Sequence, residues 1–114
     1  MQMRIPVRGL LSLTLLVLAG CKPLPPSKPM AELTPQELRG AQLFAAQCAR
    51  CHEPNTTHRL KGPGLQAITK IPPFNTAEGD GRIRDLIAHG RFSMPATPLN
   101  EEQFRNLLAY LHTL

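Results

Sequence analysis

The chain has 114 residues, a net charge of +5, three Cys, four Phe, one Tyr and no Trp. This length fits one small domain. So few aromatic residues give a thin core, which leaves such a domain marginally stable without a cofactor or a cross-link. The positive charges are not gathered in a basic run, so the composition gives no indication that nucleic acid is a partner.

The first twenty residues have the pattern of a secretory signal. Arg4 and Arg8 precede an apolar run over residues 10–18, and Leu18-Ala19-Gly20-Cys21 follows. An apolar run this short behind positive charge is typical of a signal peptide and is too short to span a membrane comfortably. Leu-Ala-Gly-Cys resembles the bacterial lipobox, so we expect residues 1–20 to be a lipoprotein signal peptide. Secretion without lipid and a retained transmembrane anchor are the alternatives.

Cys21 would then be lipidated and become the first residue of the mature chain. Several acyl chains on this residue would hold the protein stably at a membrane. Removing residues 1–20 also removes two arginines, which lowers the net charge from +5 to +3. Lys22 stands where an Asp would signal retention in the inner membrane. We therefore expect the protein in the cell envelope, on the periplasmic side, with the outer membrane slightly preferred.

Residues 21–31 are expected to form a tether. This segment contains four prolines and two lysines, and so much proline disfavours a helix and favours an extended, semi-rigid polyproline conformation. At about 3.1 Å per residue, the ten positions from Cys21 to Met30 could hold a domain roughly 30 Å from the bilayer. The alternative is an ordered coil that packs on the domain.

The first helix is expected to begin after Leu33. Thr34-Pro35-Gln36-Glu37 has the pattern of a capping box with Pro at the first helical position, and Leu33 with Leu38 would form a hydrophobic staple. Gly40 lies inside this helix, where a Gly is destabilising unless a close contact uses it. The apolar positions on one face predict its buried stripe: Leu38, Ala41, Ala45 and Cys48.

This helix leads into the most specific motif of the chain, Cys48-Ala49-Arg50-Cys51-His52. Two thiols three residues apart lie on the same side of a helical turn, and C-x-x-C-H is the attachment signature of c-type haem. Both sulfurs could add to the vinyl groups of one haem while His52 binds its iron. The motif predicts covalent haem, and the redox chemistry of that cofactor makes electron transfer the leading function.

Other interpretations of the motif have less support. A zinc site needs four ligands, and the candidates here would be Cys48, Cys51, His52 and His58. The sequence has no second Cys pair, and the spacing to a distal His pair that is typical of zinc fingers is missing. A thioredoxin-like redox pair would need a βαβ context, and no segment has the periodicity of a strand. A disulfide across so short a loop would stabilise little. With lipid on Cys21 and haem on the other two cysteines, no thiol remains for a disulfide, and both modifications belong outside the cytoplasm.

Two more helices are expected further along the chain. One begins at Asp80 or Gly81 and ends at Gly90, with Ile83, Leu86 and Ile87 as its apolar positions. The other begins after Asn100, which pairs with Gln103 in a box-like cap. Its apolar positions recur at helical spacing: Phe104, Leu107, Leu108 and Leu111. No segment alternates like a strand for long enough, so the sequence predicts an all-α protein.

Residues 32–114 resemble a class I (mono-haem) cytochrome c. The resemblance rests on separated features in a fixed order: the helix with Gly40 and Phe44, the Cys48–His52 motif, Gly62-Pro63-Gly64-Leu65, Gly90 to Pro95, and the terminal helix with Leu107 and Tyr110. It implies a cytochrome c domain over residues 32–114, with helices packed around one covalently bound haem c. It also implies that Gly40 and Phe44 meet Leu107 and Tyr110 where the first and last helices cross. The short stretch before Met94 suggests the compact bacterial type with few loops.

The resemblance further implies which residues hold the haem. Cys48 and Cys51 would form the thioethers, and His52 and Met94 would be the two axial ligands of the iron. In the family, the proline carbonyl of Gly-Pro-x-Leu accepts the second ring N–H of the ligating His, which implies that role for Pro63. Leu65 and Ile68 would wall the haem. The neutral thioether of Met94 favours ferrous iron and raises the potential; His89 and His58 are the alternative ligands.

Together these expectations describe a membrane-tethered mono-haem cytochrome that passes single electrons between a donor and an acceptor protein outside the cytoplasm. Two strong axial ligands leave no open position on the iron, so we expect an electron carrier and not an enzyme. The alternatives are a fixed haem c subunit of a larger oxidoreductase, and a haem sensor or peroxidase-like protein if Met94 dissociates. Five basic residues would rim the haem, either as a docking ring for an acidic partner or as ordinary solvated surface: Arg50, Arg59, Lys61, Lys70 and Arg91.

Overall fold

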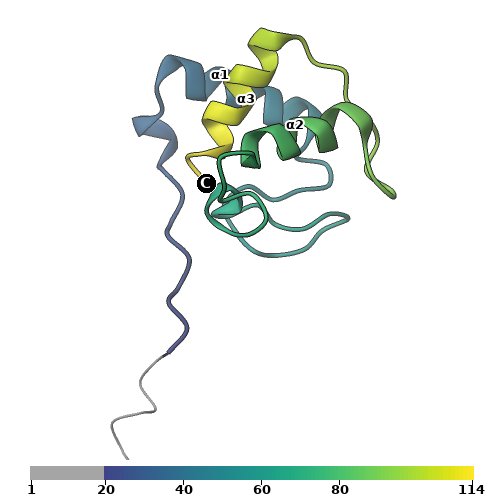
Figure 1. Ribbon diagram of the computed structural model, residues 1–114. Helices are drawn as coiled ribbons and strands as arrows, with labels where there is room; N and C mark the ends of the chain where they lie inside the picture. Colours follow the sequence, from purple (N-terminus) through teal and green to yellow (C-terminus); the bar gives the residue numbers. More distant parts are fainter. Residues whose placement is uncertain (1–19) are drawn as a thin grey trace, which may run out of the picture.

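The computed structural model describes residues 20–114, so the expected signal peptide lies outside the described residues apart from Gly20. Within this range the chain forms three α-helices, α1 (Pro35–Gln47), α2 (Gly79–His89) and α3 (Glu101–Leu111). The same range also contains two short 3-10 helices (Figure 1). The first, η2 (Met30–Glu32), lies just before α1, and the second, η3 (Ile68–Lys70), lies between α1 and α2. The described part of the chain contains no β-strand, and its one isolated bridge joins Arg91 and Met94. The predicted all-α class is confirmed.

The two predicted capping boxes are present and set where α1 and α3 begin. The Thr34 hydroxyl accepts from the Glu37 N–H at 3.2 Å, and the Glu37 carboxylate accepts from the Thr34 N–H at 2.8 Å. Asn100 and Gln103 make the same reciprocal pair at the start of α3, with both bonds at 2.9 Å. Each box satisfies two of the backbone donors that the first turn of a helix leaves unpaired.

Helices α1 and α3 cross at Gly40. A Cβ atom on this residue would overlap the backbone carbonyl of Asn106 and lie 2.7 Å from the Cβ atom of Tyr110. The rings of Phe44 and Tyr110 meet edge to face, with their centroids 5.6 Å apart, and Leu107 in the same core cluster is 1 % exposed. The crossing implied by the resemblance is confirmed, and the close approach of the two backbones explains why a Gly stands inside the helix.

The buried face of α1 differs from the predicted stripe. Ala41 and Phe44 are buried and Cys48 is half-buried, as expected, but Leu38 is 39 % exposed and Ala45 is exposed as well. The helix packs where the missing side chain of Gly40 lets α3 approach, so its buried face is centred on positions 40, 41 and 44. The prediction for Leu38 and Ala45 was wrong because it weighed apolar side chains and gave no weight to the glycine.

Helix α2 begins at Gly79, one residue before the earlier of the two predicted starts, Asp80 and Gly81, and its C-cap is Gly90 as predicted. Ile83 and Ile87 are buried, and Leu86 is half-buried. Gly90 has a φ of 73°, and a Cβ atom there would lie 2.6 Å from the Met94 carbonyl oxygen. Only a glycine therefore suits the point where the chain leaves α2 and folds back towards Met94.

The expected tether is not free along its whole length. The Gln66 side chain donates to the Pro25 carbonyl oxygen at 3.0 Å, and the Lys28 N–H donates to the Thr113 carbonyl oxygen at 2.7 Å. The ordered coil that packs on the domain, weighed above as the alternative, therefore describes residues 25–30. Among the described residues, no helix is both long and apolar enough to span a membrane.

Candidate functional site

The Cys48–His52 motif forms a tight turn at the end of α1. Cys48 is the C-cap of the helix, and its carbonyl oxygen accepts from the N–H groups of Cys51 and His52 at 3.1 and 3.0 Å. This turn places the two thiols near each other, and both are free and half-buried. Burial raises the pKa of the Cys48 thiol to about 11, and the charge of Cys51 adds to the shift. Such surroundings suit a thioether, which carries no charge to be desolvated.

The imidazole of His52 is held by the loop that follows the motif. Its Nδ1 atom lies 2.8 Å from the carbonyl oxygen of Pro63. Because a carbonyl can only accept, Nδ1 carries the proton and donates it, which leaves the lone pair of Nε2 available for a metal. This is the tautomer and the orientation that a ligating His needs.

Gly62 brings this loop against the ring. Its N–H donates to the Cys51 carbonyl oxygen at 2.8 Å, and a Cβ atom at Gly62 would overlap the His52 ring, lying 2.8 Å from Nδ1 and 3.0 Å from Nε2. From the sequence, Gly62 had no predicted role beyond its place in the Gly-Pro motif. The available signal was the glycine itself, because a residue without a Cβ atom is favoured where the backbone closely approaches another group.

We expect Gly62→Ala to lower the free energy of unfolding by about 1–3 kcal/mol, because the ring or the loop must move to admit the methyl group. Denaturant unfolding followed by circular dichroism measures this change. Gly81→Ala is the matched control, since nothing lies within 4 Å of its Cβ position inside α2. There the same substitution should stabilise by up to about 1 kcal/mol. Equal shifts in the two variants would contradict the close approach at His52.

Leu65 and Ile68, the expected wall of the haem, lie at the end of the loop that follows the Cys48–His52 motif and at the start of η3. The Leu65 N–H donates to the Glu53 carbonyl oxygen at 2.8 Å, which ties the two sides of the loop together. Leu65 and Ile68 are half-buried and pack against the core cluster. Each side chain is therefore an apolar group that is partly exposed and packs on the core.

Met94 comes from the segment that follows α2. It exchanges two backbone hydrogen bonds with Arg91, at 3.0 and 2.9 Å, and the Thr97 N–H donates to the Ile87 carbonyl oxygen at 2.8 Å. The side chain of Met94 is half-buried and packs against the core. Phe92, inside the same turn, is 94 % exposed and has a φ of 51°. The turn therefore directs Met94 inward and Phe92 into solvent.

The other histidines have surroundings of their own. His89 is exposed, and its Nδ1 atom lies 3.1 Å from the Asp85 carbonyl oxygen one turn earlier in α2. His58 is exposed in the loop. His112 lies 2.8 Å from the Asp80 carboxylate and so connects the end of α3 with the start of α2. No group of three or more His, Cys, Asp and Glu side chains within residues 20–114 is arranged to hold a metal ion.

The five basic residues of the expected docking ring differ in their contacts. The Lys70 ammonium donates to the Leu114 carbonyl oxygen at 2.7 Å, and the Arg91 guanidinium lies 5.0 Å from the centroid of the Phe92 ring. Arg50, Arg59 and Lys61 are exposed. A docking role for these side chains stays a prediction.

The helical fold and the Cys48–His52 turn define the class of a c-type cytochrome domain. Residues 35–111 match the family model described as cytochrome c oxidase, cbb3-type, subunit III. The match covers more than half of the chain and includes all three helices, so the chain belongs to this family. The family implies haem c and haem-based electron transfer. Neither a curated protein nor a solved structure gives a significant match.

Proposed function

We propose that the protein is a class I, mono-haem cytochrome c that is tethered to a membrane and transfers single electrons between redox proteins outside the cytoplasm. The observation that carries the proposal is the hydrogen bond between His52 Nδ1 and the Pro63 carbonyl oxygen. This bond leaves Nε2 free, one residue away from the second thiol of a Cys pair. A structural or redox Cys pair would have no need of such an oriented imidazole.

Each residue of the site has a defined task in this proposal. Cys48 and Cys51 would hold the porphyrin through thioethers, His52 Nε2 and the Met94 sulfur would bind its iron, and Leu65 would pack against the porphyrin. When bound, the haem supplies one-electron chemistry. The Pro63 carbonyl makes the His52 nitrogen a stronger donor, while the soft thioether of Met94 favours the ferrous state and raises the potential. Two strong ligands leave no open coordination position, as suits a carrier.

A fixed subunit of a larger oxidoreductase is the second candidate, because the family description names a subunit of an oxidase. A fixed subunit would co-purify with its partners in constant ratio, whereas a carrier would dissociate from them. Donor and acceptor are redox proteins in both cases. Exposed basic residues of the ring, such as Arg50, would face an acidic docking surface on such a partner.

The tether and the location are part of the proposal. Its support is Leu18-Ala19-Gly20-Cys21 behind a basic and apolar segment, together with the exposed position of Cys21 at the far end of the polyproline segment. Lipid on Cys21 would keep the protein on the periplasmic side of a membrane. Lys22 favours the outer membrane where the envelope has two.

Mass spectrometry of the mature protein tests both modifications together. We expect the intact chain to begin at Cys21 and to carry one haem and several acyl chains, with the haem retained after acid-acetone treatment because thioethers survive it. The Cys21→Ser variant should lose the lipid and keep the haem spectrum. Haem-free polypeptide from correctly matured protein would contradict the attachment, and an unmodified Cys21 thiol would contradict the lipid anchor.

A further inference from the structure

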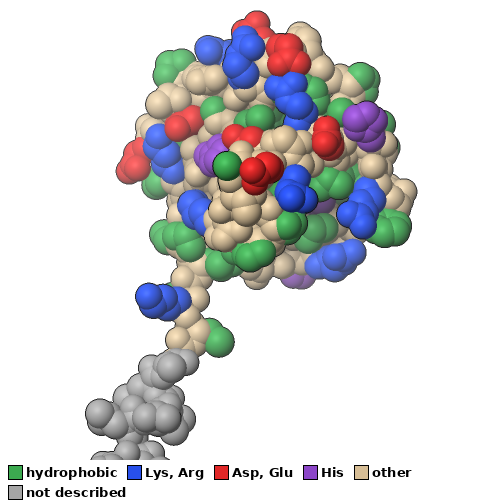
Figure 2. All heavy atoms as spheres, in the orientation of Figure 1, with side chains coloured by type: hydrophobic (Ala, Val, Ile, Leu, Met, Phe, Trp, Pro, Cys, Tyr) green, Lys and Arg blue, Asp and Glu red, His purple; other side chains and the backbone are tan. Residues whose placement is uncertain are grey.

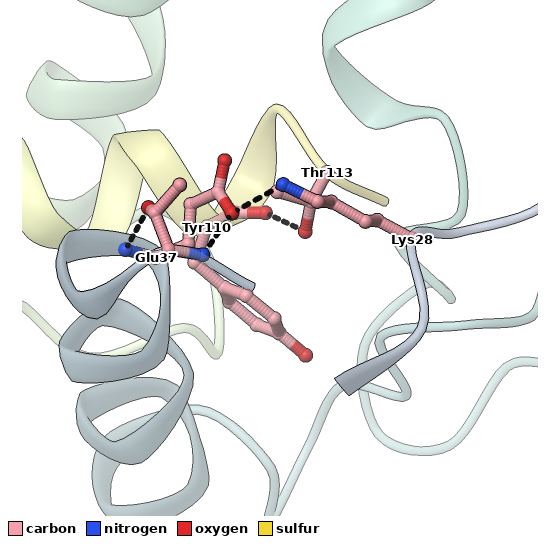
Figure 3. Close-up of polar contacts among 5 residues, drawn as sticks. Lys28, Glu37, Tyr110 and Thr113 are labelled. Atoms are coloured by element: carbon pink, nitrogen blue, oxygen red, sulfur yellow. Dashed lines mark hydrogen bonds and ion pairs between the residues drawn. The ribbon is translucent and has the colours of Figure 1, made fainter. Parts of the chain in front are cut away.

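Residues 25–30, which we call the strap, join the expected anchor to three separate parts of the domain. The Pro25 carbonyl oxygen accepts from Gln66, which follows Leu65 in the loop after the Cys48–His52 motif, and the Lys28 N–H donates to the carbonyl oxygen of Thr113, two residues after α3. The Lys28 ammonium donates to the Glu37 carboxylate at 2.7 Å, at the start of α1 (Figure 3). The strap is therefore held at three places on the domain, which fixes the direction in which the chain leaves it.

The contact between Lys28 and Glu37 is built into the fold. Their side chains are 33 % and 18 % exposed, and the same Glu37 oxygen also accepts from the Thr34 N–H in the capping box. The hydrogen bond from Lys28, followed by the one from Thr34, lowers the pKa of Glu37. The hydroxyl of Ser27, a residue of the strap, is buried. A chain segment that buries a hydroxyl and shares a helix cap is docked on the domain.

Docking shortens the reach of the tether. Only four residue steps separate Cys21 from Pro25, which at about 3.1 Å per residue span about 12 Å. The undocked segment from Cys21 to Met30 would reach roughly 30 Å. The tether leaves the domain opposite the three helices, at the end formed by the loops (Figure 1). We call this the loop end; it includes the loop of residues 53–66. An anchor on Cys21 would therefore bring this loop end close to the bilayer.

The loop end has the side chains that suit an anionic membrane surface. Arg59 and Lys61 are exposed, and Leu60 between them is 42 % exposed. Lys22 in the tether adds a charge, while Glu53 in the same loop is half-buried and accepts from the Thr56 hydroxyl at 2.8 Å. Figure 2 shows Lys, Arg and His side chains at the end of the domain nearest the tether, whereas Asp and Glu lie farther from it on this face.

We propose that the strap holds the loop end of the domain against the membrane that carries the anchor, with Arg59, Leu60 and Lys61 in contact with anionic lipid headgroups. The inference rests on the proposed lipidation of Cys21. Basic residues are attracted to an anionic leaflet within about a Debye length, roughly 8–10 Å. A free segment that spans at most about 12 Å keeps the loop end near this range, whereas a tether extended to roughly 30 Å would hold it well outside. The membrane then takes part in orienting the domain.

Neutron reflectometry of the lipidated holoprotein tests the proposal on supported phosphatidylcholine bilayers with and without phosphatidylglycerol. We expect a gap of about 12 Å or less between headgroups and domain on the anionic bilayer. Lys28→Glu combined with Gln66→Ala should widen it towards roughly 30 Å, because the first change repels Glu37 and the second releases Pro25. A native gap near the larger value on both bilayers would overturn the inference.

Charge variants test the lipid contact. Arg59→Glu with Lys61→Glu should widen the gap on the anionic bilayer and remove the difference between the two bilayers. Arg39→Glu with Arg105→Glu makes the same change in net charge at exposed positions on α1 and α3, and should have no effect. Equal effects of the two pairs, or none from either, would overturn the contact between Arg59, Lys61 and the lipid headgroups.

A failure of this inference can be distinguished from a failure of the proposed function. Anchored protein without haem would contradict electron transfer while the gap could still be measured. Protein with haem but without lipid on Cys21 would keep the cytochrome and overturn the anchor together with this inference.

Discussion

Met94→His is expected to lower the reduction potential of the holoprotein by on the order of 0.1 V while the haem stays six-coordinate and low-spin. Axial ligands control haem potentials over a range of about 0.8 V, and a second imidazole favours ferric iron where a thioether favours ferrous iron. Potentiometric titration followed by the visible spectrum measures the change. Met94 is suited to this test because its backbone is fixed by two hydrogen bonds to Arg91.

Met94→Ala should open the sixth position and let the ferrous protein bind carbon monoxide, which the native protein should not bind. Met30 is the matched control, because it is the other methionine of the expected mature chain and is 59 % exposed in η2. Met30→Ala should leave potential and spectrum unchanged. Native protein that already binds carbon monoxide would favour the sensor or peroxidase-like alternative. Variants at Met94 with the native potential would show that another residue is the ligand.

Gly40→Val is expected to destabilise the protein by about 3 kcal/mol, which is a large fraction of the stability of a small domain. Any side chain at Gly40 meets the backbone carbonyl of Asn106, which cannot move without displacing α3. Chemical denaturation followed by circular dichroism gives the free energy of unfolding.

Ala45→Val is the control for this substitution, since Ala45 is exposed on the same helix. It should cost well under about 1 kcal/mol, the amount by which a β-branched residue lowers helix propensity. Similar stabilities of the two variants would contradict the close crossing of α1 and α3.

Local patterns in the sequence were enough to predict the helices. The capping residues Thr34 and Asn100 bond to groups three positions away, and Gly90 ends α2 through its own backbone conformation. Predicting the buried face of α1 requires knowledge of the tertiary packing, because this face depends on where Gly40 meets α3. The spacing of apolar residues within one helix does not contain that information. Leu38 was therefore misplaced.

The strap was harder to predict for the same reason. Its side-chain contacts join residues 9 and 41 positions apart, Lys28 with Glu37 and Gln66 with Pro25, and no periodic pattern connects them. From sequence alone, a segment so rich in proline is predicted to be a free polyproline chain, because its hydrogen-bond partners lie elsewhere in the sequence. The bond between His52 and Pro63 was expected only from the resemblance to cytochrome c, whereas the close packing of Gly62 on the ring emerged from the structure.

The turn that contains Met94 also bears on the speed of the proposed reaction. Its backbone is closed by the pair with Arg91, joined to α2 through Thr97 and Ile87, and packed closely against Gly90. With Met94 as ligand, such a rigid segment would shift little when the iron gains or loses charge. The nuclear rearrangement that accompanies each electron would then be small. A carrier built in this way can exchange electrons rapidly with partners whose potentials differ only slightly from its own.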